Sequence, residues 1–518
     1  MVIEPMDEEV REQLEAGSAQ ADSSNVVNGH AQDDRSRQLF DTNKLTPEAI
    51  REVIVVPDVE KMRELQLDNG LQVVIMNHGE APLVKIGVRV AGDDAVAPHD
   101  GMDTMAEYLY SGSSALNSQT QSPLRVAGEA MRNQRQVYAS GSSGNVEQLL
   151  HQTRLQIDEI DWQMADKTQR IKSFVSRSKS QGRNPDVWAS RLRSERVWPN
   201  HPYGAWWKPA DFEIMKDWSK AELQAWQQTK WQPANAYLVV VGKIDVDETE
   251  RYVREYFSSW AYEGSSTPGK LAPPPAPTEL PERQVLLFDK PIATQSKVTL
   301  ACPLKREGDQ HYARTQVISK LFTYFAFGRL REQKGLTYGA YASPSMMWGD
   351  TTQMRISTVI QNSGAAYGVQ TMFDIIEEGA NGELDEGLIA TEKWNVARET
   401  VTRIQSGDQM LSTILSKGRE NLDFFRQYPD ELSNVSQADF QDALSICKDH
   451  EVVTVVGPVD TIKESFDEKG IAYEVIEWED LYLEQLTEKE RKKYLKNKAK
   501  QEAEEAKAAE EEAETEAG

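Results

Sequence analysis

The sequence predicts an α+β protein built from two tandem copies of one domain. Strand patterns, then helical segments, then a closing strand follow one another twice along the 518 residues. Three segments of the first half recur in order in the second half at an offset of about 212 to 215 residues. A proline-rich stretch separates the two copies, and proline can neither continue a helix nor donate to a sheet.

The first half opens with an apolar strand predicted over 71–76. Val84, Ile86, Val88 and Val90 then alternate with less apolar residues, which is the period of a half-buried strand. Helical segments follow, and one of them begins with a capping-box pattern over 219–222. The closing strand of the first half is predicted over 237–242.

The segments that recur in the second half are short apolar strands, and a single match between such strands would be weak evidence. Three matches in one order and at one spacing indicate a tandem duplication. The matched pairs are 72–75 with 284–287, 85–88 with 297–300, and 240–245 with 455–460.

We therefore predict five regions with different roles. The ends are a flexible polar arm, with one helix near 47–54, and a charged tail rich in Glu and Ala. The regions are the arm 1–60, the first domain 61–264, the proline-rich linker 265–281, the second domain 282–484 and the tail 485–518.

Composition excludes several classes of function. The formal charge of −25 argues against nucleic acid and anionic membranes as main partners. No apolar run reaches the roughly 20 residues of a transmembrane helix. Cys302 and Cys447 are too few for a disulfide framework or a four-thiolate zinc site, and are expected to be buried apolar residues. As written, the chain is expected in the cytoplasm, with the periplasm left open if it is part of a longer precursor.

Five segments in order resemble the insulinase-like, or pitrilysin-type, inverzincin metallopeptidases, whose members include mitochondrial processing peptidase subunits and bacterial relatives. The segments are 67–74, 101–112, 201–204, 233–236 and 330–338. The resemblance covers about residues 62 to 480. It implies two metallopeptidase-like α/β sandwich domains that face each other as a clamshell around an unfolded peptide.

In this family a His-x-x-Glu-His helix binds zinc through both histidines, and the Glu is the general base. Here the corresponding segment carries Thr104, Glu107 and Tyr108, so the acid is kept while both imidazoles are missing. A threonine hydroxyl stays protonated at neutral pH, and a tyrosine has a pKa near ~10. We interpret Glu107 as vestigial or structural, and Thr104 and Tyr108 as degenerate metal positions.

The family's third zinc ligand is a Glu on a later helix. Aligned on the Asn-Pro dipeptide at 184–185, that position falls near Ser176 or Arg177, and neither supplies a carboxylate. All three ligands are then absent, so we expect no metal bound by this chain.

Arg331 and Tyr338 match an Arg and a Tyr that in active relatives reach the substrate from the C-terminal domain. The guanidinium supplies a fixed fork of donors, and the Tyr hydroxyl can donate toward an oxyanion. The alternative is structural: a helix end with a salt bridge, followed by an aromatic at a strand start.

The leading hypothesis is a non-catalytic, substrate-binding subunit or half of a zinc peptidase. It would contribute Arg331 and Tyr338 to the site of a zinc-bearing partner, and would not be active alone. A scaffold protein on an inactive peptidase fold is the alternative. An active metallopeptidase with an atypical metal site is the third interpretation.

Overall fold

The computed structural model describes residues 44–91, 125–131, 134–158, 167–206, 216–261, 277–305, 311–346, 352–417 and 422–500. Within these ranges the strands form two six-stranded sheets, with the orders β1-β2-β6-β3-β5-β4 and β12-β7-β11-β8-β10-β9. The first sheet contains β1 (Met62–Gln66), β2 (Gln72–Asn77), β3 (Leu83–Ala91), β4 (Arg125–Met131), β5 (Gln134–Ser142) and β6 (Ala236–Gly242). The second contains β7 (Gln284–Asp289), β8 (Gln295–Leu304), β9 (Thr337–Met346), β10 (Thr352–Gln361), β11 (Val452–Gly457) and β12 (Glu474–Ile476).

Five strands of each sheet share one topology, as a duplication requires, while the sixth differs: β1 precedes β2 and is antiparallel to it, whereas β12 comes last and is parallel to β7. In the first, β6 lies between a parallel β2 and an antiparallel β3. In the second, β11 lies between a parallel β7 and an antiparallel β8. The predicted strands at 71–76, 84–90 and 237–242 correspond to β2, β3 and β6. The α+β fold class is therefore confirmed.

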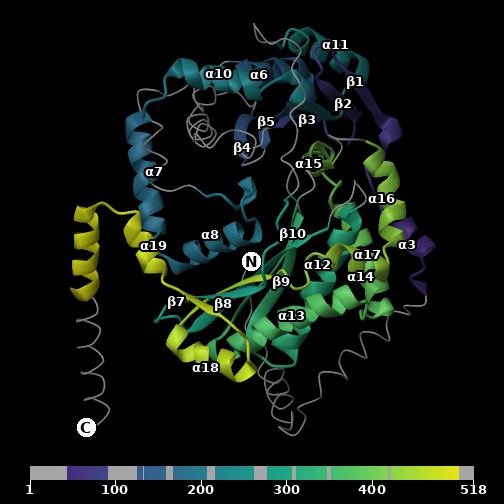
Figure 1. Ribbon diagram of the computed structural model, residues 1–518. Helices are drawn as coiled ribbons and strands as arrows, with labels where there is room; N and C mark the ends of the chain where they lie inside the picture. The colour runs from purple at the N-terminus through teal and green to yellow at the C-terminus, as the bar shows by residue number, and fades with distance from the viewer. Residues whose placement is uncertain are drawn as a thin grey trace, which may run out of the picture.

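Helices cover both sheets and connect them (Figure 1). The helices of the first half are α3 (Pro47–Val53), α6 (Val146–Asp158), α7 (Lys167–Gln181), α8 (Pro185–Val197), α10 (Lys220–Lys230) and α11 (Val246–Phe257). Those of the second half are α12 (His311–Phe327), α13 (Ala365–Asn381), α14 (Glu386–Thr402), α15 (Gly407–Lys417), α16 (Asp423–Asn434), α17 (Gln437–Leu444), α18 (Val459–Lys469) and α19 (Trp478–Glu484). Short helical turns are η2 (Val59–Lys61), η3 (Ser143–Asn145), η5 (Pro202–Gly204), η6 (Pro233–Asn235), η7 (Gly328–Glu332) and η8 (Asn362–Gly364).

Local capping explains where several helices begin. The carboxamide of Asn184 accepts a hydrogen bond from the amide of Asp186, and Pro185 occupies the first turn of α8. Ahead of α10, the predicted capping box is confirmed. The Ser219 amide donates to a Glu222 carboxylate oxygen at 2.7 Å, and the Glu222 amide donates to the Ser219 hydroxyl at 3.2 Å.

The two halves exchange one helix each. From the first half, α8 packs on the second sheet, where Trp188 and Val197 join a buried cluster with Leu286 and Phe288. From the second half, α15 packs on the first sheet, where Leu411 and Leu415 join Val74 and Val239. In Figure 1 both helices lie between the two sheets. Each sheet therefore buries one face through a helix of the other half, so neither half is a separate packing unit.

The opposite faces are covered by helices of the same half. In the first half, Ile75 and Val240 pack with Leu149 of α6 and Phe257 of α11. In the second half, the larger cluster around Leu287 and Val455 includes side chains of α12, α13, α17 and α18. Residues on either face of a strand alternate between these clusters, as the period of a β-strand requires.

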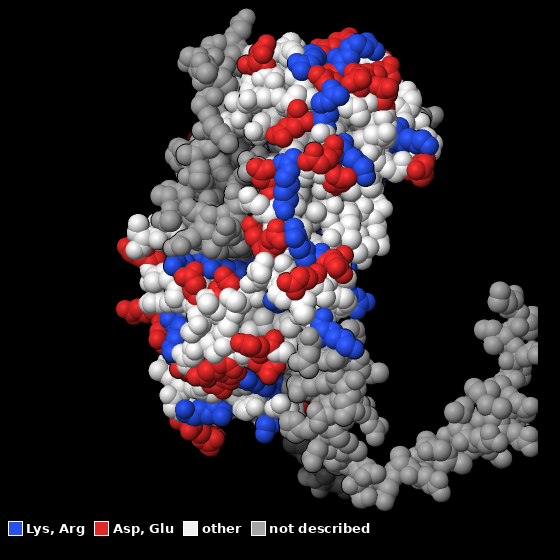
Figure 2. Space-filling model, turned by 90° about the vertical axis from the view of Figure 1, so that its right-hand side faces the viewer, with Lys and Arg blue, Asp and Glu red and all other residues white. Residues whose placement is uncertain are grey.

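Both ends of the described chain are held by contacts. Ile50 of α3 is fully buried in the core of the second half, so the end of the predicted arm (44–60) packs on the protein. Ion pairs join Arg51 to Asp430 and Arg426 to Glu60. Figure 2 shows acidic and basic side chains interspersed over this face. At the other end, a helix over 488–500 contacts α7 through an ion pair between Lys179 and Glu490.

Cys302 and Cys447 are both fully buried, as predicted, but they form a disulfide. This bond was not predicted from the sequence, because two cysteines 145 positions apart show no pairing signal. The tertiary fold brings β8 next to the segment after α17 and places the two sulfur atoms together.

Within the described ranges, no helix combines the length and apolar character that crossing a bilayer requires.

Candidate functional site

Arg331 lies where α12 ends in a wider helical turn. The π-helical turn η7 continues α12 directly and contains Arg331. Gly335 then takes a left-handed conformation with φ of +62°, which glycine adopts without steric cost. The Leu336 amide donates back to the Leu330 carbonyl at 2.9 Å, closing the turn. The chain thereby returns beside η7 and begins β9 at Thr337.

Arg331 and Tyr338 are brought together by this turn. The guanidinium carbon of Arg331 lies 5.4 Å from the centre of the Tyr338 ring, within cation–π range. One guanidinium nitrogen also donates to the carbonyl oxygens of Thr337 and Tyr338, at 3.4 and 3.2 Å. Tyr338 is 85% exposed. The guanidinium is thus held in place by carbonyl oxygens and a ring face, and no carboxylate of the described residues forms an ion pair with it.

The pair opens into a cavity of about 430 Å³, lined also by Gln295, Glu332 and Gln361. Of the structural alternative, the salt bridge is not seen among the described residues, where the acceptors of Arg331 are carbonyl oxygens, but the aromatic residue does stand at the start of a strand. An exposed phenol and a guanidinium with unused donors can bind a carbonyl or carboxylate oxygen of a ligand.

The residues predicted at the degenerate metal site divide between two regions. Ser176 and Arg177 lie exposed on α7. Their hydroxyl and guanidinium do not fit a zinc site, because a guanidinium has no lone pair to donate and repels a cation. Thr104, Glu107 and Tyr108 lie outside the described residues, so their interpretation stays a prediction. Over the described ranges, no three His, Cys, Asp or Glu side chains gather as metal ligands would.

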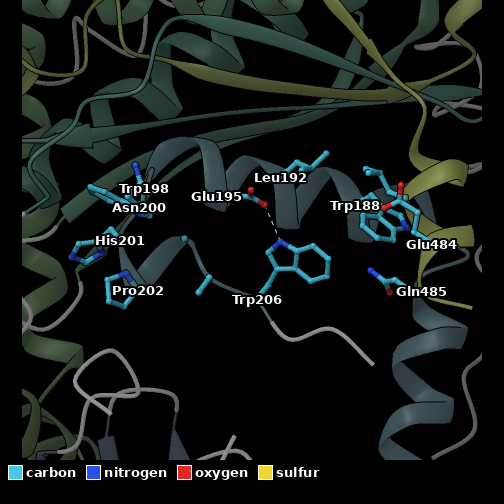
Figure 3. A pocket seen from close by; sticks show the side chains of 13 residues that line it. Trp188, Leu192, Glu195, Trp198, Asn200, His201, Pro202, Trp206, Glu484 and Gln485 are labelled. Atoms are coloured by element: carbon cyan, nitrogen blue, oxygen red, sulfur yellow. Dashed lines mark hydrogen bonds between the residues drawn. The ribbon is translucent and has the colours of Figure 1, made fainter. Parts of the chain in front are cut away.

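A larger cavity of about 850 Å³ lies between α8, the turn η5 and α19. Figure 3 shows Trp188, Trp198 and Trp206 around it, with His201 at one end and Glu484 and Gln485 at the other. The Trp206 indole donates to a Glu195 carboxylate oxygen at 3.0 Å.

Arg191 is held between two of these tryptophans, 5.3 Å from the centre of the Trp188 ring and 4.7 Å from that of Trp206. This cavity was not predicted from the sequence. The tryptophans clustered between 188 and 207 were its available signal.

Among protein families, the peptidase M16 inactive domain matches residues 217–396 of this chain. That range includes Arg331 and Tyr338. A comparison with curated proteins finds no match.

Solved structures of M16-like proteins share the fold across most of the chain. A protease from Helicobacter pylori matches with a TM-score of 0.65 and 14% identity, over 77% of this chain and 99% of that one. A peptidase M16 inactive domain from Pseudomonas fluorescens matches with a TM-score of 0.64 and 16% identity, over 77% and 98%. The periplasmic protease PqqL from Escherichia coli matches with a TM-score of 0.62 and 14% identity, over 78% of this chain and 46% of that one.

These matches show the fold of this chain. The fold is that of the M16-like, insulinase-like peptidases, and residues 217–396 match a domain described as inactive. The resemblance derived from the sequence is confirmed at this level.

Proposed function

We propose that this chain is a non-catalytic, substrate-binding subunit of an insulinase-like zinc peptidase. It presents Arg331 and Tyr338 to a peptide held at the active site of a zinc-bearing partner. The observation that carries the proposal is the arrangement of this pair: a guanidinium, without an ion-pair partner among the described residues, stacked on an exposed phenol at the mouth of a cavity. The match of the surrounding segment to an inactive M16 domain supports it.

The chemistry of the pair suits a role in binding and positioning. A guanidinium with unused donors can hold a peptide carbonyl, and a phenol can donate to the same group as negative charge develops. Both act through hydrogen bonds, so neither requires a metal on this chain. Zinc chemistry belongs to the proposed partner, because Ser176 and Arg177 do not fit a metal site.

The difference in length between this chain and PqqL supports an assembly of two parts. This chain covers 46% of that protease, so a single PqqL chain has room for two units of this size. We infer that this chain corresponds to one such unit and that its zinc-bearing counterpart is a separate chain or a further part of the same one. The peptide would be enclosed between them.

The test measures peptide turnover by the purified chain mixed with a zinc-bearing M16 subunit from the same source. Arg331→Ala should lower turnover about 10²-fold, because one transition-state donor is lost. Arg329→Ala is the matched control: it lies two residues earlier in η7 but pairs with Glu378 at 2.5 Å. Its turnover should stay within a few-fold of the unmodified chain.

Equal turnover for the Arg331→Ala and unmodified proteins would contradict the proposal and favour the scaffold alternative. Isolation of a stable complex that lacks any zinc peptidase would point the same way. Turnover by this chain alone, with stoichiometric zinc, would instead favour the third interpretation.

A further inference from the structure

A second polar pocket lies between α8 and the second sheet. It encloses about 190 Å³, and its wall includes Arg193 from α8, Arg355 from β10 and Lys297 from β8. Because α8 comes from the first half and the strands come from the second, this pocket exists only through the exchange of helices described above.

The floor of the pocket is a row of hydroxyl groups. In the strand register Thr454 of β11 lies opposite Thr299 of β8, and Thr299 lies opposite Ser357 of β10. All three side chains line the pocket, and both threonines are buried. The Thr454 hydroxyl already donates to the Thr299 carbonyl oxygen at 3.4 Å, so the hydroxyls of Thr299 and Ser357 are the ones that can donate to an anion, without bringing a negative charge.

The positive charge of the pocket is not neutralised by the protein. Arg193 donates to the hydroxyl of Thr454 at 2.8 Å, and Arg355 donates to the hydroxyl of Ser343 at 3.4 Å. No carboxylate in the described residues pairs with either guanidinium. Burial, reinforced by the charge of Arg355, lowers the pKa of Arg193 to about 10.

The one acidic group in the wall is already engaged. Asp186 pairs with Lys290 at 2.9 Å and with Lys297 at 3.4 Å. It therefore offsets the lysines and leaves both arginines uncompensated. The two guanidiniums repel each other, with solvent screening at the exposed Arg355, and an anion between them would turn this repulsion into attraction. The chain has a net charge of −25, so the positive charge of this pocket is opposite in sign to that of the protein as a whole.

We propose that this pocket binds a small oxyanion, and that the anion is a carboxylate of the bound peptide. Arginine forms paired hydrogen bonds to carboxylate oxygens. A volume of 190 Å³ accommodates one carboxylate group, but not several peptide side chains together. The inference that the pocket binds an oxyanion depends only on the residues of the pocket. The inference that this oxyanion belongs to a bound peptide rests on the proposed function.

The position of the pocket sets the spacing of that carboxylate. Ile360 of β10 pairs with Thr337, next to Tyr338, and Arg355 lies five residues before it on the same strand. Five residues of β-strand span about 17 Å. A peptide that contacts Tyr338 and also reaches Arg355 would therefore carry its carboxylate about five residues from the contacted bond.

The experiment measures direct binding to the purified full chain, without a zinc partner. The four probes are a fluorescein-labelled octapeptide of neutral residues with a free C-terminal carboxylate, the same peptide with a C-terminal amide, and amidated versions with one internal Glu or Gln. Inorganic phosphate serves as a competitor. Failure of this test is separate from failure of the proposed function, which is measured as turnover in the complex.

At least one carboxylate peptide should bind about tenfold or more tightly than its amide counterpart. Either the C-terminal or the internal pair can show the difference, and this identifies the source of the carboxylate. Phosphate should compete. Arg355→Met should abolish the preference for the carboxylate peptide, and because the Arg355 side chain is exposed this variant should still fold. Arg193→Met should also abolish the preference, whereas Arg193→Lys should keep part of it. Arg251→Met on α11 is the control, since Arg251 is exposed and far from the pocket in sequence and fold.

Equal binding of all four peptides would overturn the carboxylate assignment. A preference that survives in folded Arg355→Met would overturn the role of this pocket. Competition by phosphate without any preference among peptides would overturn the assignment to a peptide.

Discussion

The guanidinium of Arg331 stacks on the ring of Tyr338 while donating to that residue's own carbonyl oxygen at 3.2 Å. These two contacts hold the arginine side chain against Tyr338 at the start of β9. The tyrosine is 85% exposed and lies at an irregularity of the ladder, between the pairs Thr337–Ile360 and Ala340–Thr358. Such a pair is preorganised for a ligand, because the arginine loses little side-chain freedom when it binds.

Tyr338→Phe should lower turnover in the two-subunit complex by about tenfold or more while leaving stability unchanged. The hydroxyl is lost, but the ring still supports Arg331, and an exposed group contributes little to folding. Tyr341→Phe is the matched control in the same strand, with 65% exposure. Steady-state kinetics and thermal melting of both variants check this. Equal loss in both would show a general effect on the strand.

The contact between Gly87 of β3 and Leu415 of α15 should control how the exchanged helix is held. A Cβ at Gly87 would lie 2.4 Å from Leu415 Cδ1. Gly87→Ala should cost about 1–3 kcal/mol through overpacking, and Leu415→Ala about 2–5 kcal/mol through a cavity. The double variant should lose less than the sum, because alanine at 87 fills part of the cavity.

Urea unfolding of the four proteins measures this coupling. Gly144→Ala serves as the control, since no atom lies closer than 3.9 Å to its added Cβ. Strict additivity of the Gly87 and Leu415 effects would contradict the close packing of α15 on the first sheet.

Reduction of the Cys302–Cys447 disulfide should lower stability by about 2–5 kcal/mol, because it constrains a loop of more than a hundred residues in the unfolded chain. Both sulfurs are fully buried, so the native protein should resist mild reductant and lose the bond only on unfolding. Thermal melting with and without a strong reductant measures the cost, and Cys302→Ala/Cys447→Ala is the reference. Free thiols in protein purified without reductant would contradict the bond. A persistent bond favours an oxidising compartment such as the periplasm over the cytoplasm.

The contact between the helix over 488–500 and α7 should weaken in acid. A hydrogen bond from Lys179, with further bonds from Thr487, lowers the pKa of Glu490 from its ordinary value of 4.5 to about 2. A depressed carboxyl pKa stabilises the contact fully above about pH 4.5 and loses that contribution as pH falls toward 2. Because Glu490 is 43% exposed, the effect should stay below about 1 kcal/mol.

Hydrogen exchange of 488–500 as a function of pH measures this weakening. Lys179→Met should raise exchange already at neutral pH and flatten the dependence between pH 4.5 and 2. Lys492→Met is the control, because its pair with Glu488 is largely exposed and lies within the helix. Unchanged exchange in Lys179→Met would show that packing of Tyr494 on Tyr482 holds the helix without the ion pair.

The two-fold repeat of the sheets could be predicted because strands carry their own period. The alternation from Val84 to Val90 and the recurrence of similar segments depend on neighbours along the chain. Arg331 and Tyr338 could be selected because they stand seven positions apart in a segment that resembles a known family. That they touch depends on the turn at Gly335, and this contact is a property of the fold.

Patterns along the chain were enough to predict the fold class, the repeat of the strands and the choice of Arg331 and Tyr338 as candidate site residues. The packing of α8 and α15 on the sheet of the other half, the Cys302–Cys447 bond and the pocket between Arg193 and Arg355 became visible only in the folded chain. The physical reason is the range of the interactions involved. Strand period, caps and turns are set within about ten residues, whereas burial, disulfide pairing and charge compensation depend on residues that only folding brings together.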